Sequence, residues 1–92
     1  SCINNIVVTV MGADRVCIVA GVASALAKEN INILDISQTI LGDIFDMVLI
    51  CDMEKAKGSL KEVQDELGAL GKELGVDVRA QLADIFYAMH RI

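Results

Sequence analysis

A strand-to-helix junction near the N-terminus holds the residues best suited to bind a small ligand. The apolar run at residues 6–11 predicts a strand, and Gly12 follows it, where the backbone can turn without a Cβ clash. Asp14 then supplies a carboxylate that can accept from the first N–H groups of a helix. Because the N-terminal end of a helix carries unpaired donors and a positive dipole end, the junction suits a carboxylate or phosphate. The same pattern also fits a helix cap without a ligand.

The residue types and spacing indicate no catalytic or metal site. Cys2, Cys17 and Cys51 show no C-x-x-C spacing, and His90 is the only imidazole. A structural zinc site needs about four clustered ligands, and no nucleophile and base are placed together by the pattern. We therefore expect no enzyme activity, no metal and no cofactor. Cys51 is expected in the core, and Cys17 is expected to pack against the sheet from the first helical turn, although a thiol at a helix N-terminus can also be activated.

The composition argues against nucleic acid and membrane as direct partners. The 92 residues contain 8 Lys and Arg against 13 Asp and Glu, and only 3% are aromatic. A nucleic-acid surface needs a basic stripe or stacking aromatic residues. No apolar stretch is long enough to cross a bilayer, and residues 1–5 do not resemble a secretory signal. We therefore expect a cytoplasmic protein of one domain.

The hydrophobic pattern predicts a helix followed by a hairpin. The helix is expected from Arg15 to Glu29, and Asn30 is a suitable left-handed stop. Residues 31–41 and 44–51 are expected to pair around a turn at Gly42, with a bulge between Ile33 and Leu34 where the alternation shifts. The helix face expected to pack on the sheet consists of Val16, Val19, Ala20, Ala23, Leu26 and Ala27.

A second helix, a last strand and a short terminal helix complete the pattern. Ser59 and Glu62 match a capping box, and Gly75 is expected to end the helix that begins there. Gly68 and Gly71 each weaken that helix by about 1 kcal/mol relative to alanine, unless they permit a close approach. Residues 76–82 alternate as a half-exposed strand does, and Asp84 is expected to cap the terminal helix.

This element order predicts an α+β fold, a ferredoxin-like βαββαβ sandwich. Its antiparallel sheet has the order 4-1-3-2, with two helices on one face and a short C-terminal helix. The two central strands carry apolar residues on both faces, and 54% of the residues are hydrophobic. We therefore expect the open face to meet the C-terminal segment or another subunit, and the protein to form a homodimer.

Five segments together resemble the ACT domain, a small regulatory module of amino-acid metabolism. They are residues 10–16, 18–22, 30–33, 35–39 and 85–92. The resemblance covers the single domain of residues 1–92 and is to stand-alone, single-domain members of poorly characterised role. It implies pairing side by side or face to face. It also implies an amino-acid site where the loop after the first strand meets the start of the second strand.

The resemblance also identifies candidate ligand-binding residues. By position, the site would include Gly12, Asp14, Arg15, Asn32 and Ile33, and we expect the backbone of Ala13 to join them. The family usually has glycine in place of Cys17, and a cysteine side chain there would either narrow the pocket or close it.

The expected function is that of a non-catalytic regulatory module. It would dimerise, bind a small amino acid near the subunit interface and act on a metabolic enzyme or regulator. The alternative is a structural dimerisation or protein-interaction module with no small-molecule ligand.

Overall fold

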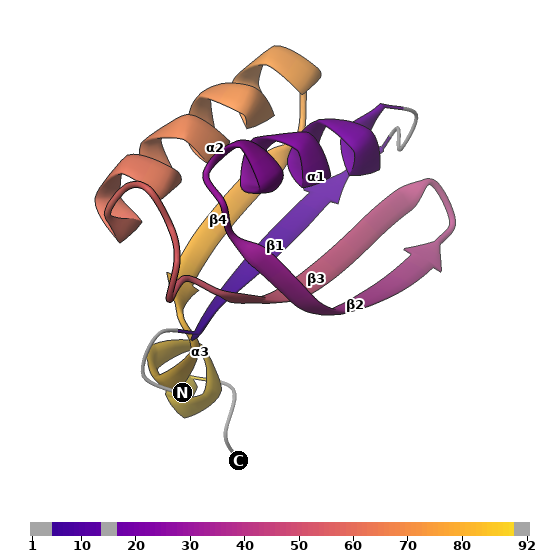
Figure 1. Ribbon diagram of the computed structural model, residues 1–92. Coiled ribbons are helices and arrows are strands. Elements are labelled where there is room, and N and C mark those ends of the chain that lie inside the picture. The colour runs from indigo at the N-terminus through magenta and orange to yellow at the C-terminus, as the bar shows by residue number, and fades with distance from the viewer. Residues whose placement is uncertain (1–4, 14–16, 90–92) are drawn as a thin grey trace.

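Four antiparallel strands form one sheet in the computed structural model, which describes residues 5–13 and 17–89. The strands are β1 (Asn5–Gly12), β2 (Asn32–Leu41), β3 (Ile44–Asp52) and β4 (Asp77–Leu82). Two helices, α1 (Ile18–Lys28) and α2 (Leu60–Leu74), cover one face, and α3 (Ala83–Met89) lies at one end of the sheet (Figure 1). The strand order β2-β3-β1-β4 confirms the predicted fold class and topology.

β1 forms the centre of the hydrophobic core. Ile6, Val8 and Val10 are fully buried in one cluster with residues of both covering helices. Val7 points to the opposite face and is also fully buried. α3 contacts both β1 and β4, so the C-terminal helix covers that end of the open face, as the apolar pattern predicts.

Local side-chain chemistry sets the predicted ends of α2. The Ser59 hydroxyl accepts from the Glu62 backbone N–H at 3.2 Å, and the Glu62 carboxylate accepts from the Ser59 backbone N–H at 2.9 Å. These reciprocal bonds satisfy two backbone donors that the first helical turn leaves unpaired. Gly75 ends the helix in the left-handed conformation, with φ of 75°.

The predicted turns and the predicted bulge are also confirmed. Asn30 follows α1 at φ of 61° and donates from its side chain to the Lys55 carbonyl at 2.8 Å. Gly42 occupies the two-residue hairpin turn, also at φ of 61°. The pairing of β2 with β3 shifts between Ile33 and Asp35, so Leu34 is the extra residue of a bulge.

The predicted start of α1 is wrong, and its predicted buried face is right only in part, because Leu26 is buried and Val19 packs against the core. The helix begins at Ile18 rather than Arg15, and its buried residues are Ile18, Val22 and Leu26. Ala20 and Ala27, which were predicted on the buried face, are exposed. A face of large aliphatic side chains at four-residue spacing removes more apolar area from water than a face rich in alanine, and this difference orients the helix. Val16 lies outside the described residues.

The predicted cap of the C-terminal helix is also displaced. α3 begins at Ala83, so Asp84 lies in the first turn and is not the capping residue. A carboxylate in the first turn still interacts favourably with the helix dipole.

The two glycines inside α2 have different surroundings. A Cβ atom added at Gly71 would lie 2.7 Å from the Val76 carbonyl oxygen and 3.2 Å from Cγ2 of Val78. A Cβ atom added at Gly68 would have no atom within 4 Å. Gly71 therefore permits the close approach of β4 to α2, whereas Gly68 only weakens the helix.

We expect opposite effects of alanine at these positions. Gly68→Ala should raise the free energy of unfolding by about 1 kcal/mol, because alanine favours the helix. Gly71→Ala should lower it by about 1–3 kcal/mol, because the added methyl group forces backbone apart. Urea denaturation followed by circular dichroism measures both values. A change of the same sign in the two variants would contradict this assignment.

Candidate functional site

The end of β1 positions the first predicted site residues. Gly12 is the last residue of β1 and pairs with Phe45 of β3, and Ala13 follows it exposed to solvent. A Cβ atom added at Gly12 would collide with the Val76 side chain. Packing against Val76 therefore requires glycine at this position. A different reason was predicted from the sequence, which was that glycine lets the backbone turn. Asp14 and Arg15 lie outside the described residues.

Cys17 differs from its prediction. It is exposed and occupies the N-cap position of α1, at φ of 73° and ψ of −14°, rather than packing in the first turn. The N-cap is therefore Cys17 and not Asp14. Its side chain makes no capping hydrogen bond, and the first turn of α1 contains no acidic residue. A left-handed conformation costs a non-glycine residue about 1–2 kcal/mol, which is a physical reason for a glycine at this position.

Asn32 and Ile33 begin β2, where they pair with Asp52 and Cys51 of β3. Asn32 is exposed and Ile33 is half-buried. Asn32 of β2 and Asn5 of β1 both pair with Asp52 of β3, so β1 and β2 start at the same end of the sheet.

The two halves of the predicted site therefore lie at opposite ends of the sheet. Gly12 of β1 and Ile40 of β2 both pair with Phe45 of β3, so Gly12 lies level with the end of β2. Phe45 and Asp52 are separated along β3 by about 23 Å, at roughly 3.3 Å per residue. Within one chain, Asn32 does not meet the β1 end of the site.

A hollow of about 480 Å³ adjoins Asn32. Its other lining residues include Asn30, which follows α1, Asp52 at the end of β3, and Lys55 in the loop after β3. Asp52 accepts from the Glu54 backbone N–H at 2.9 Å, and Asn30 donates to Lys55 as described above. These polar groups therefore stabilise the loop.

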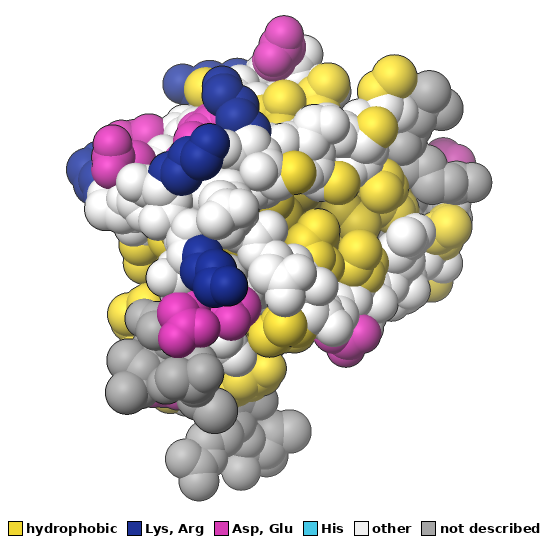
Figure 2. All heavy atoms as spheres, in the orientation of Figure 1, with side chains coloured by type: hydrophobic (Ala, Val, Ile, Leu, Met, Phe, Trp, Pro, Cys, Tyr) yellow, Lys and Arg dark blue, Asp and Glu magenta, His cyan; other side chains and the backbone are white. Residues whose placement is uncertain are grey.

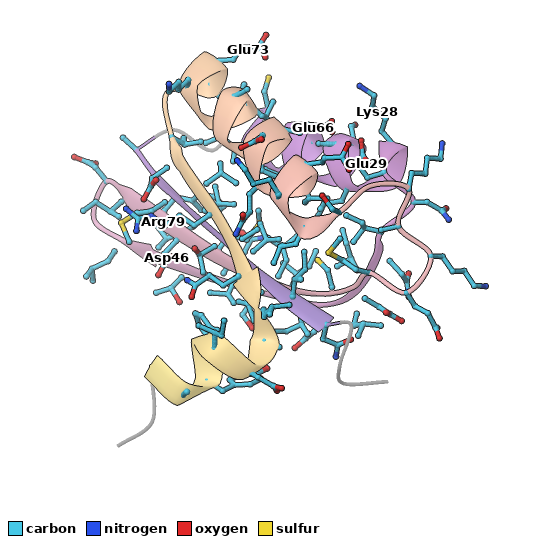
Figure 3. All side chains as sticks on the ribbon, turned by 90° about the vertical axis from the view of Figure 1, so that its left-hand side faces the viewer. Lys28, Glu29, Asp46, Glu66, Glu73 and Arg79 are labelled. Atoms are coloured by element: carbon cyan, nitrogen blue, oxygen red, sulfur yellow. The ribbon has the colours of Figure 1, made fainter. Side chains whose placement is uncertain are left out.

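Charged residues at the same end join the two helices. Figure 3 shows Lys28, Glu29 and Glu66 near one another where α1 and α2 meet. Lys28 Nζ lies 3.8 Å from Glu66 Oε2. A side-chain hydrogen bond with Glu66 raises the pKa of Glu29, with smaller effects from desolvation and from nearby carboxylates. This cluster lies far from the β1 end of the predicted site, because Lys28 ends α1.

The outer edge of β2 is exposed, and half of its residues are apolar. Among its ten residues, Asp35 is the only charged one, and none is proline. Leu34, Ile36 and Ile40 are between 42% and 52% exposed. Figure 2 shows hydrophobic side chains on the surface between α1 and the β2–β3 hairpin. Natural edge strands usually carry lysine, proline or a cover, so a long bare edge is suited to pair with another strand.

The opposite edge of the sheet is better protected. β4 has only six residues and carries Asp77 and Arg79, whose Oδ2 and Nε atoms lie 3.0 Å apart. It continues directly into α3. Of the two edges, β2 is therefore the better candidate for pairing between chains.

Of the two cysteines that the structure describes, Cys51 lies in the core. Cys51 is fully buried as predicted, and desolvation raises the pKa of its thiol to about 11. Within residues 5–13 and 17–89, no three His, Cys, Asp or Glu side chains are grouped as metal ligands. No helix in this part of the chain has the length and hydropathy needed to cross a bilayer. Cys2 and His90 lie outside the described residues.

Comparison with known proteins identifies the family. The family model described as an ACT domain matches residues 4–81. A UPF0237 protein of Methanopyrus kandleri is 54% identical over 86 residues, which are 94% of this chain and 96% of that protein. The structure of an ACT domain protein from Streptococcus pneumoniae matches with a TM-score of 0.79 and 36% identity, over 89% of this chain and 92% of that chain.

A more distant structural match shares the fold alone. It is the regulatory subunit of aspartate kinase from Thermus thermophilus, with a TM-score of 0.64 and 22% identity over 86% of this chain and 51% of that chain.

The fold and these matches define an ACT domain. The chain belongs to the ACT domain family and, within it, to the UPF0237 proteins. The family match occupies residues 4–81, so these 92 residues hold no separate catalytic domain.

Substitution at Cys17 tests its backbone strain. We expect Cys17→Gly to raise the free energy of unfolding by about 1 kcal/mol, because glycine adopts positive φ without a Cβ clash. Cys17→Ala keeps a Cβ atom and should stay within about 0.5 kcal/mol of the parent. Thermal and urea melts of the two variants measure the difference. Equal stability of the glycine and alanine variants would show that the N-cap is not strained.

Proposed function

We propose that this ACT domain is a non-catalytic regulatory module that pairs through its β2 edges and binds a small amino acid between the two chains. ACT domains are typically regulatory ligand-binding modules. The observation that carries the proposal is the exposed apolar edge of β2, which leaves backbone donors and acceptors available to a second strand.

A two-fold axis at this edge would bring the separated halves of the site to the same end of one joined sheet. Two β2 strands related by such an axis run antiparallel. Full overlap of residues 32–41 sets Asn32 opposite the partner's Leu41. Leu41 is next to Ile40, which is aligned with Gly12. Asn32 and Ile33 of one chain would therefore lie at the same end of the joined sheet as Gly12 of the other chain.

The groups at this junction suit the two charges of an amino acid. The first N–H groups of α1 and the backbone of Ala13 can donate to a carboxylate, and the helix dipole favours a negative charge there. The Asn32 side-chain carbonyl and the Asp14 carboxylate can accept from an ammonium group. Cys17 occupies the adjacent N-cap of α1, and its side chain takes space that a glycine residue would leave open. A small ligand, such as free glycine or serine, is therefore favoured.

The alternative function is a structural dimerisation or protein-interaction module with no small-molecule ligand. The same β2 edge supports it. The two functions differ in one respect, because only the regulatory module predicts that an amino acid stabilises the fold. In either case the partner acted on would be a metabolic enzyme or regulator.

The dimer interface can be tested by placing charge on β2. Light scattering at micromolar concentration should give about twice the 9.9 kDa chain mass. The double variant Ile36→Lys with Ile40→Lys should be monomeric, because pairing would desolvate two ammonium groups without partners. The control is Ile85→Lys, which adds charge at a 51% exposed position of α3 and should remain dimeric. A monomeric parent, or a dimeric double variant, would contradict the interface.

Ligand binding can be tested by its effect on unfolding. Glycine or serine at a hundredfold excess over its dissociation constant should stabilise the folded form by about 2.7 kcal/mol in a thermal melt. Asn32→Ala and Asp14→Ala should each remove this shift and leave the dimer intact. The control Glu73→Gln, on the exposed face of α2, should keep it. If no amino acid shifts the melt of the parent or of Cys17→Gly, the structural module is the better function.

A further inference from the structure

The open face of the sheet contains a hollow that the proposed dimer interface leaves unused. Its volume is about 600 Å³, within the range of small-molecule sites. Residues from β1, β3, β4 and α3 line it, among them Thr9, Met11, Asp46, Val48, Arg79 and Phe86.

The strand register places these side chains in two neighbouring rows. Thr9 pairs with both Val48 and Arg79, and Met11 pairs with both Asp46 and Asp77. In the next row, Val7 is fully buried, and α3 contacts β1 and β4. The terminal helix therefore closes one end of the hollow and contributes Phe86 to its wall.

The hollow combines one cation with two carboxylates. Arg79 Nε donates to Asp77 Oδ2 at 3.0 Å, which orients the guanidinium group. Asp46 forms no ion pair with any described residue. Figure 3 shows Arg79 and Asp46 near each other, on the side of the sheet away from α1 and α2.

The spacing and lining restrict the ligand. β3 and β4 flank β1, so the strands that carry Asp46 and Arg79 lie about 9–10 Å apart. Their side chains line the same hollow, whose volume is sufficient for one small dipolar molecule. Two carboxylates against one cation disfavour the binding of a simple anion in the hollow. The positive charge of Arg79 disfavours the binding of a simple cation. Met11, Val48 and Phe86 add an apolar surface that glycine or serine would not use.

We propose that this hollow is a second binding site, for an α-amino acid with an apolar side chain. The ligand carboxylate binds the Arg79 guanidinium group, and its ammonium group binds the Asp46 carboxylate. The ligand side chain packs against Met11, Val48 and Phe86. This site is formed within one chain and does not depend on the proposed dimer or on its ligand.

Nuclear magnetic resonance with L-leucine as the probe tests the site. Addition of L-leucine to the full chain should shift the backbone amides of Thr9, Val48 and Arg79. 4-Methylpentanoate lacks the ammonium group and 3-methylbutan-1-amine lacks the carboxylate, so each should bind about tenfold more weakly. Shifts confined to residues 12–17 and 32–33 would place leucine at the interface instead and overturn the proposal.

Variants at the two charges complete the test. Arg79→Gln and Asp46→Asn should each weaken L-leucine binding about tenfold or more, whereas Lys72→Gln on α2 should not change it. Asn32→Ala should also leave it unchanged, which separates this site from the interfacial one. Unaltered binding to the Arg79 and Asp46 variants, or no binding to the parent, would overturn the proposal. Open-face shifts that follow protein concentration rather than leucine would assign the face to a second copy of the chain.

Discussion

The common direction of β1 and β2 is the constraint on which the proposed site depends. α1 crosses back over the sheet between them, so both strands start at the same end and Asn5 and Asn32 are aligned through Asp52. The end of β1 and the start of β2 must then lie at opposite ends of the sheet (Figure 1). No side-chain movement bridges about 23 Å, so a site that uses both must be completed by another chain.

A site shared between chains would couple ligand binding to assembly. A ligand that contacts both subunits binds the dimer and not the separate chains, so it stabilises the dimer by mass action. The reverse also holds, because the two equilibria share one coupling free energy. A regulatory module can act on an attached or associated protein in this way. In the proposed dimer, the exposed Ile36 and Ile40 would supply apolar contact area.

Local chemistry made most of the fold predictable from the sequence. Ser59 with Glu62, Asn30 and Gly42 each determine a cap or turn through their own side chain or backbone freedom, and each lies where predicted. Cys17 could not be predicted in this way, because nothing in its residue type indicates positive φ. The start of α1 was misplaced for the same reason. The separation of Gly12 from Asn32 is implicit in the element order but becomes evident only with the strand register.

Mixing two defective variants tests most directly whether the site is shared between chains. Asn32→Ala alters one half of the proposed site and Asp14→Ala the other, so a homodimer of either variant has no intact site. If the site is assembled from two chains, co-refolding the variants produces mixed dimers that each hold one intact site. We predict that glycine or serine binding, measured by calorimetry, is absent in each variant alone and returns in the mixture. Failure of the mixture to bind, while the parent binds, would show that both residues act within one chain and would contradict the account.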